Sequence, residues 1–230
     1  MAKGKSVAEP RPTEPLVDRA RRELEERFVT LQLEPGSVWS EASLSELLGI
    51  GRTPVREATA RMAIDGLLVI MPRAGILVSQ ISVEEQMAVL ETRRVLEKLV
   101  SMRAARRASE TERERLAQMA DDIEKAGNAD DVRGYLQSHF VIKRFVARCA
   151  QNVFSERALR PLHTLSQRFY FAFHREFDNL AEVGSAHATL TRAIASGDEA
   201  KAGVLCDGVS DIADRFTQDL FLRRSGSRAR

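Results

Sequence analysis

Hydrophobic residues recur at helical spacing along most of the chain. From Leu16 to Leu31, apolar side chains lie three or four residues apart, which predicts an amphipathic helix. The segment from Ser43 to Gly66 repeats this spacing in two short blocks, Leu44 to Leu48 and Val55 to Ala63. The segment therefore predicts a short helix, a tight turn and a second helix.

The ends of these two helices are marked by residues with known positional preferences. Ser43 is placed to cap the first helix, and Gly49 suits its C-terminus. Thr53 offers a side-chain cap and Pro54 suits the first helical position, so we expect the second helix to begin at one of them. Gly66 then closes the second helix.

The second helix buries its apolar face and thereby turns four polar residues outward at its leading end: Arg52, Thr53, Arg56 and Glu57. A helix of this kind can enter the major groove of DNA tip first. Its arginines can bind guanine O6 and N7 together, or hold a phosphate with the help of the helix N-terminus.

Two β-prone runs, Leu67 to Met71 and Ile76 to Ser79, follow the second helix and flank Pro72-Arg73-Ala74-Gly75. They predict a β-hairpin with Arg73 and Gly75 at its tip. A helix-turn-helix with such a hairpin is a winged helix, and its wing can reach the minor groove or the DNA backbone. The expected winged helix-turn-helix domain covers residues 16–80 and has three helices and a small hairpin.

A second domain, helical throughout, is expected over residues 81–222. Ser82 and Glu85 have the spacing of a capping box at its start. Cap and turn residues divide the rest into six predicted helices, at about 83–107, 110–126, 130–150, 153–177, 179–195 and 199–222. The fold class is thus mostly α. Residues 1–15 are expected to be a disordered arm and residues 223–230 a basic disordered tail.

The composition narrows the functional class. No apolar run approaches the roughly 20 residues of a membrane span, which excludes a membrane protein. Cys149 and Cys206 lack the spacing of a disulfide framework or zinc knuckle, so the cytoplasm is the expected compartment. Residues 1–80 carry eleven Lys and Arg and eleven Asp and Glu, so DNA binding must depend on where the arginines lie.

Several motifs in the first domain occur in order at the spacing of a known family. They are Pro35-Gly36, Leu44 to Leu48, Arg52-Thr53-Pro54-Val55-Arg56-Glu57-Ala58, Gly66-Leu67-Leu68 and Pro72-Arg73-Ala74-Gly75. Over about 65 residues the chain resembles the DNA-binding domain of the GntR family of bacterial transcription factors. The alternative, an amphipathic helical hairpin with solvated arginines, does not account for this series.

The second domain resembles, more loosely, the FCD effector domain of the FadR-like branch of that family. The residues that carry this resemblance are Glu91-Thr92-Arg93-Arg94-Val95-Leu96-Glu97, Ala150-Gln151-Asn152, His187, Ala193-Ile194 and Gly197-Asp198. The two resemblances together cover roughly residues 16–222. They imply a homodimer that binds a palindromic double-stranded DNA operator and a small carboxylate effector.

In many members of this branch one aspartate and three histidines hold a metal in the effector cavity. Alignment on the motifs puts His139 at the aspartate position, Lys143 and His187 at two histidine positions, and Val209 at the third. Only one of the four positions keeps its residue type. We therefore predict no tightly bound metal and no other cofactor, although His139 and His187 could still act as a pair.

Helical periodicity predicts, independently of the family resemblance, which of these side chains face the interior of the domain. Lys143 and His139 lie on the apolar side of their predicted helix, and Arg93 lies on that of the first helix of the domain, beside Glu97. A buried cation needs an anion, which either a protein carboxylate or a ligand must supply. Lys143 could also extend to the solvent. His163 and His174 are interpreted as surface or packing residues.

The leading functional hypothesis is a dimeric transcriptional repressor controlled by a small organic acid without the usual metal. Arg93, His139, Lys143 and His187 are its predicted effector-binding residues. A regulator with a decayed pocket and a metal-dependent carboxylate sensor using His139 and His187 are the alternatives. An enzyme is disfavoured, because no catalytic partner motif accompanies the lysine and the histidines.

Overall fold

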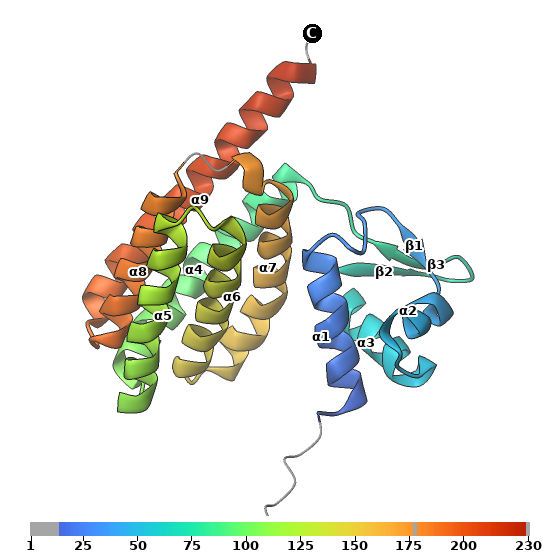
Figure 1. Ribbon diagram of the computed structural model, residues 1–230, viewed down its shortest axis with the longest axis horizontal. Coiled ribbons are helices and arrows are strands. Elements are labelled where there is room, and N and C mark those ends of the chain that lie inside the picture. Colours follow the sequence, from blue (N-terminus) through green and yellow to red (C-terminus); the bar gives the residue numbers. More distant parts are fainter. Residues whose placement is uncertain (1–13, 177–178, 229–230) are drawn as a thin grey trace, which may run out of the picture.

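The computed structural model describes residues 14–176 and 179–228 and contains two hydrophobic cores. One core is built from residues 20 to 78 and the other from residues 83 to 220. Figure 1 shows the N-terminal unit beside a larger helical bundle, with α1 next to α7. The two expected domains therefore each bury a core of their own. Most of the predicted arm, residues 1–13, lies outside the described residues.

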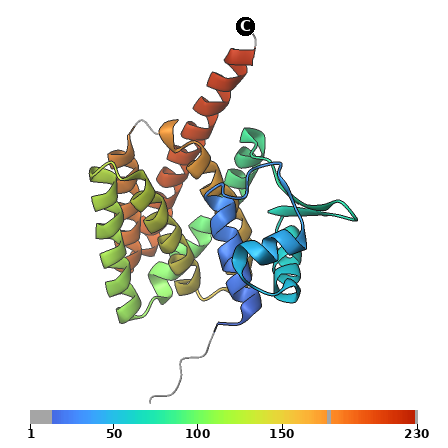
Figure 2. The same cartoon turned by 45° about the vertical axis from the view of Figure 1, so that its right-hand side comes forward.

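The N-terminal domain is the predicted winged helix. Its helices are α1 (Leu16–Val29), α2 (Glu41–Leu48) and α3 (Arg52–Ile64). Its antiparallel sheet has the order β1-β3-β2, made of β1 (Val38–Trp39), β2 (Leu68–Met71) and β3 (Gly75–Val78). The hairpin β2–β3 projects away from the helical bundle in both Figure 1 and Figure 2, which leaves its tip accessible.

Two predicted helix caps were wrong by a few residues. Ser40, not Ser43, caps α2, and Ser43 completes the capping box by returning its hydroxyl to the Ser40 backbone N–H, 3.0 Å away. Gly51 stands at the N-cap of α3, so Thr53 is already inside the helix and does not cap it. The predicted helix ends were right, because Gly49 and Gly66 both have positive φ.

The C-terminal domain is helical over its described residues, as predicted. Its elements are α4 (Val83–Arg107), α5 (Glu110–Asn128), α6 (Val132–Cys149), α7 (Val153–Ala172), the 3-10 turn His174–Glu176, α8 (Leu180–Ala195) and α9 (Glu199–Arg228). Ser82, Ser109 and Asn152 cap their helices as the sequence indicated. The capping box expected at Ser82 is incomplete, because the Ser82 hydroxyl accepts from Glu85 N–H but donates to the Glu84 carboxylate. Gly127 and Gly184 let α5 and α8 approach closely, since a Cβ on Gly127 would lie 2.9 Å from the Leu180 carbonyl oxygen.

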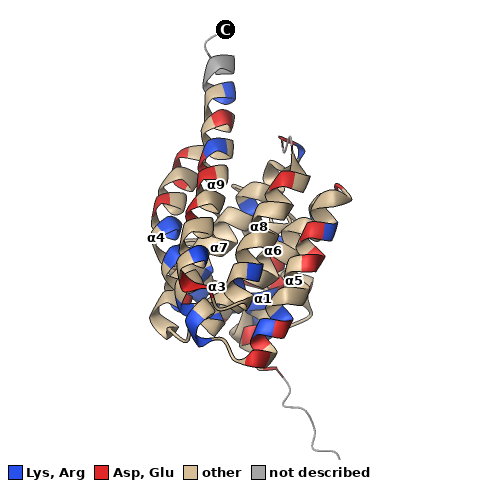
Figure 3. Ribbon diagram, turned by 90° about the vertical axis from the view of Figure 1, so that its left-hand side faces the viewer, with Lys and Arg blue, Asp and Glu red and all other residues tan. Residues whose placement is uncertain are grey.

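The predicted disordered tail was wrong over most of its length, because α9 continues to Arg228. Each residue added to an existing helix gains a backbone hydrogen bond without a new nucleation cost, so α9 continues beyond the predicted end at residue 222. Arg224 lies over the ring of Phe173 at 4.9 Å, and beyond this contact α9 projects away from the bundle (Figure 1). Figure 3 shows acidic and basic residues mixed along α9 and the neighbouring helices.

Arg168 of α7 is one of the residues through which the two domains meet, beside Leu165 and the Arg160–Asp65 pair. Its guanidinium lies 3.9 Å from the ring centroid of Phe28 in α1, and its Nη1 donates to the Ser79 carbonyl oxygen at 2.7 Å. The side chain is 1% exposed and has no carboxylate partner among the described residues. Burial accordingly lowers the pKa of Arg168 to about 10. This contact joins the helical bundle to α1 and to Ser79, which follows β3.

Candidate DNA-binding helix and effector pocket

The four residues predicted to lead the recognition helix are all exposed at the start of α3: Arg52, Thr53, Arg56 and Glu57. Their helix is held from behind by Val55, Ala58 and Met62, which are fully buried. No side chain caps the amides of the first turn of α3. Free amides and two arginines at one helix end form a favourable surface for a phosphate or a base edge.

The wing presents Arg73 at its tip in a sterically unfavourable backbone conformation. Ala74 N–H donates to the Met71 carbonyl oxygen at 3.1 Å, and Arg73 occupies the third position of this turn with φ of 63°. That position usually holds glycine or asparagine. Gly75 is explained by packing, since a Cβ there would lie 2.7 Å from the backbone oxygen of Trp39 in β1. The structure therefore explains why residue 75 is glycine without a DNA contact, and its contact with DNA stays a prediction.

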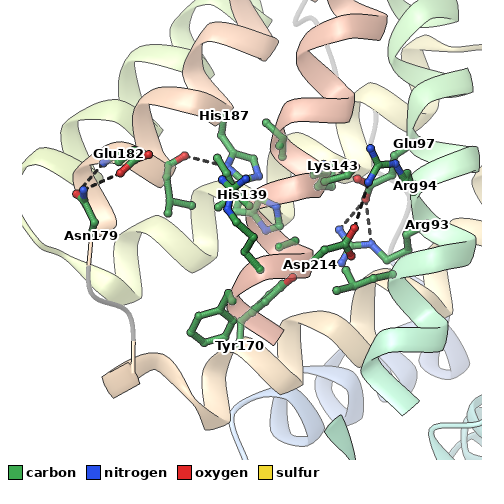
Figure 4. A pocket seen from close by; sticks show the side chains of 18 of the residues that line it. Arg93, Arg94, Glu97, His139, Lys143, Tyr170, Asn179, Glu182, His187 and Asp214 are labelled. Atoms are coloured by element: carbon green, nitrogen blue, oxygen red, sulfur yellow. Dashed lines mark hydrogen bonds and ion pairs between the residues drawn. The ribbon is translucent and has the colours of Figure 1, made fainter. Parts of the chain in front are cut away.

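A cavity of about 240 Å³ lies inside the helical domain. Its walls come from α4, α6, α7, α8 and α9, and the predicted effector residues Arg93, His139, Lys143 and His187 all line it. Val209, the fourth position that the resemblance singled out, lines it as well. Helical periodicity thus placed these side chains on the correct faces, and the fold brings them to one cavity (Figure 4).

Glu97 is the centre of a buried charged cluster at the inner end of this cavity. Its Oε1 accepts from Arg93 Nη2 at 2.7 Å and from His163 Nε2 at 2.9 Å, and its Oε2 accepts from Lys143 Nζ at 2.7 Å. All four side chains are at most 8% exposed. Of the two sources of an anion that the sequence left open, the structure shows a protein carboxylate, Glu97, beside both Arg93 and Lys143, and Lys143 does not extend to the solvent.

The charges of this cluster follow from its contacts. Burial alone would raise the pKa of Glu97, but Arg93, Lys143 and His163 outweigh it and hold that pKa well below its usual range. Burial lowers the pKa of His163, so this histidine is neutral and donates its Nε2–H to the carboxylate. Two cations and one carboxylate leave a net charge of +1 at the inner end of the cavity.

Besides Glu97, the Tyr170 hydroxyl also interacts with the Arg93 guanidinium, which leaves one nitrogen of that guanidinium to consider. The buried Nη1 of Arg93 has no hydrogen-bond partner in the part of the chain that the structure describes. An unsatisfied buried donor is unfavourable by roughly 1–3 kcal/mol, and more when it is charged. Arg93 and Lys143 both line the cavity, so two cations that share one carboxylate stand beside this space.

His139 and His187 lie between this cluster and the mouth of the cavity. Their ring centroids are 4.6 Å apart, and burial lowers the pKa of both, that of His187 to about 3. His187 Nδ1 donates to the Val183 carbonyl oxygen at 3.0 Å, so its Nε2 carries no proton. Both histidines are therefore neutral, and His187 Nε2 can accept a hydrogen bond.

These residues do not fit the metal site known from the FadR-like branch. Lys143 brings a positive charge already bonded to Glu97, and Val209 has no donor atom. Across residues 14–176 and 179–228, no three His, Cys, Asp or Glu side chains are grouped so that they could hold a metal. His139 and His187 alone fall short of the three or four protein ligands of a stable site.

The sequence interpretation missed one member of the cluster. His163 was assigned to the surface or to packing, but it is 5% exposed and bonded to Glu97. No local pattern links α7 to α4, so only the fold could show this contact. The pairing of Arg93 with Glu97 was visible as an i, i+4 spacing on one helix.

Comparison with known families agrees with this architecture. Residues 16–78 match the model described as bacterial regulatory proteins, gntR family, and residues 88–207 match the FCD domain. The HTH-type transcriptional repressor RspR of Escherichia coli K12 is 33% identical over 101 residues, 44% of each chain. A regulator from an unstable DNA locus of Streptomyces ambofaciens is 40% identical over 58 residues, 25% of each chain. The matched stretch thus spans less than half of either relative.

Solved structures share the fold at low sequence identity. The chain is similar to E. coli McbR/YncC with a TM-score of 0.78 at 16% identity, over 91% of this chain and 100% of that one. A GntR regulator from Rhodococcus sp. RHA1 gives a TM-score of 0.67 at 19% identity, over 88% and 97% of the two chains. At these identities the similarity concerns the fold alone.

A winged helix followed by a helical effector-type bundle defines a DNA-binding transcriptional regulator rather than an enzyme. The chain belongs to the GntR family and carries the FCD domain of its FadR-like branch. Every helix in the described ranges is too short or too polar to cross a membrane.

Proposed function

We propose that the protein is a homodimeric repressor whose affinity for a palindromic operator falls when a small organic acid binds in the helical domain, without a metal. The observation that carries this proposal is that Arg93 and Lys143, two buried cations that share one carboxylate, both line a cavity of 240 Å³. This volume lies below the roughly 300–1,000 Å³ of drug-sized ligand sites, so it suits a small ligand.

In this proposal Arg93 and Lys143 hold the effector carboxylate, and His139 and His187 line its path. Arg52, Thr53, Arg56 and Glu57 of α3 contact the major groove, while Arg73 and Gly75 bring the wing to the DNA backbone or the minor groove. A dimer is expected because two recognition helices are needed to give a small winged helix specific affinity. The cytoplasm is the compartment in which such a regulator meets its operator.

The Arg168 contact gives ligand binding a route to the DNA-binding domain. Arg168 lies on α7, the helix that also carries His163 of the Glu97 cluster. Its guanidinium holds Phe28 and Ser79 of the N-terminal side. A shift of α7 on ligand binding would move the recognition helices, and DNA affinity would change to the extent that the ligand prefers one arrangement.

The test is a thermal-shift screen of small carboxylates with wild-type protein and the Lys143→Met variant. The proposal predicts that at least one carboxylate stabilises the wild type and does so much less for the variant. Elemental analysis should find no stoichiometric zinc, nickel or manganese. Stoichiometric metal that survives gel filtration and depends on His139 and His187 would contradict the metal-free site.

A regulator with a decayed pocket is the second candidate. It is favoured by one observation, namely that Glu97 already pairs with Arg93, Lys143 and His163. This version predicts operator binding that no small carboxylate changes, in both the wild type and the Lys143→Met variant.

A further inference from the structure

The cavity has two ends of opposite charge. At the inner end, Arg93, Lys143 and Glu97 leave a net charge of +1. The outer rim carries four carboxylates, those of Glu176, Glu182, Asp214 and Asp219. With the guanidiniums of Arg94 and Arg215, and of Arg223 beside Glu176, they leave a net charge of −1. A simple organic acid would satisfy the inner end only.

Two of the rim carboxylates are not neutralised by the protein. Asp214 is paired with Arg94 at 3.1 Å, and Glu176 with Arg223 at 3.6 Å. Within the described ranges, Glu182 and Asp219 have no cationic partner, and the side-chain contact of Glu182 is with the Asn179 amide at 2.8 Å. The rim thus offers carboxylate acceptors to a positively charged group.

Figure 4 shows how these groups are placed. Asn179 and Glu182 lie at one side of the cavity, the Glu97 cluster lies at the other, and His139 and His187 lie between them. The unprotonated Nε2 of His187 adds a neutral acceptor along the way. A ligand that spans this cavity therefore meets donors at its inner end and acceptors toward its mouth.

We propose that the effector is a small zwitterion, an amino acid or related amino-carboxylate, with its carboxylate on Arg93 and Lys143 and its ammonium group toward Glu182 and the rim. This inference rests on the proposed function, since it concerns the ligand of the same site. The inner contact is buried and supplies most of the affinity. The outer contact is solvent-exposed and supplies selectivity.

The test compares ligands that differ only in the ammonium group. Glycine, β-alanine, γ-aminobutyrate and δ-aminovalerate are each titrated calorimetrically against the alkanoate of the same chain length: acetate, propionate, butyrate and valerate. At the chain length that fits best, the wild type should bind the amino-carboxylate about threefold to tenfold more tightly, as expected for an exposed charge contact. Added salt should reduce this preference.

Three variants separate the two ends of the site. Glu182→Gln should reduce the preference for the amino-carboxylate and leave alkanoate binding unchanged. Glu114→Gln, at an exposed position of α5 away from the cavity, should preserve the preference. Lys143→Met should weaken both ligands of a pair together.

The possible failures are distinct. If the wild type binds each alkanoate as tightly as its amino-carboxylate, the zwitterion inference is overturned while the organic-acid site stands. The same holds if Glu182→Gln keeps the full preference. If neither series binds, the proposed function fails and the inference falls with it.

Discussion

The arginines of the recognition helix and the cations of the cavity are in opposite physical states. Arg52 and Arg56 are exposed on α3 and make no ion pair in the described part of the chain. Arg93 and Lys143 are almost fully buried and share one carboxylate, Glu97. Arg52 and Arg56 are hydrated in the free protein. Arg93 and Lys143 are buried, and without the Glu97 carboxylate their burial would be strongly unfavourable.

This difference decides what each region can bind. Exposed guanidiniums lose little hydration in the free protein and are available to phosphates and base edges. A ligand in the cavity, in contrast, meets Arg93 and Lys143 already bonded to Glu97, so it must share these two cations with the carboxylate. The cavity is therefore expected to be selective for small ligands that place a charged atom beside these two cations.

The largest effect is expected when Glu97 loses its charge. Glu97→Gln leaves Arg93 and Lys143 buried without a carboxylate, which should lower the free energy of unfolding by about 3–5 kcal/mol. Urea denaturation measures the change. Glu91→Gln, at an exposed position of the same helix, is the matched control and should change stability by less than about 0.5 kcal/mol. A small loss for Glu97→Gln would mean that the cluster is less tightly coupled than its geometry indicates.

The buried histidines predict a dependence of stability on pH. Burial lowers the folded-state pKa of His139, His163 and His187, that of His187 to about 3, while the unfolded chain titrates near 6.5. As the pH falls below 6.5 the unfolded state takes up protons that the folded state does not, so stability decreases. Each histidine contributes at most about 1.4 kcal/mol per pH unit.

Denaturation curves between about pH 7 and pH 5 test this dependence, above the range in which Glu97 adds its own loss of stability. His187→Gln should remove about a third of the slope, because one of three equivalent terms is gone. An unchanged slope in this variant would show that His187 is protonated in the folded protein.

An intermediate effect, on operator affinity, is expected for the exposed arginines of the recognition helix. Arg56→Ala should weaken operator binding by roughly 1–3 kcal/mol and leave the free energy of unfolding nearly unchanged, because its guanidinium is in water. Footprinting and urea denaturation give the two quantities. Arg61 is exposed at the other end of α3, where it pairs with Asp18, so Arg61→Ala should bind DNA almost normally. Normal footprinting by Arg56→Ala would remove this residue from the DNA interface.

The smallest effect concerns the wing tip. Arg73→Gly relieves a positive φ, so the free energy of unfolding should rise by about 0.5–1 kcal/mol, while DNA affinity falls because the guanidinium is lost. Arg73→Ala keeps the backbone strain and should lose only DNA affinity. If both variants bind DNA like the wild type, the wing does not contact the DNA.

What the sequence could predict was largely local. Glycine positions located the ends of α2 and α3, and helical periodicity placed Arg93, Lys143 and His187 on inward faces. Caps were less certain, because Ser40 and Ser43 offer the same hydroxyl three residues apart and the structure uses both in one capping box. Which of the two serines is the N-cap depends on the residue at which the helix begins, and the spacing of apolar residues does not determine that residue.

The contacts that the sequence could not predict join helices far apart in the chain. His163 meets Glu97 across 66 positions, and Arg168 meets Ser79 across 89. The position of α7 between the two domains determines both contacts, and no spacing within α7 distinguishes these residues from its other polar side chains. His163 and Arg168 are almost fully buried, which only the fold shows.

The most direct test of the account measures operator affinity with and without the tightest-binding carboxylate of the titration series. Fluorescence anisotropy on a selected operator would be recorded for the wild type and for Lys143→Met. The account predicts that the carboxylate weakens operator binding by the wild type, and that Lys143→Met binds the operator normally but does not respond. An equal response in both proteins would contradict the claim that the buried cluster senses the effector.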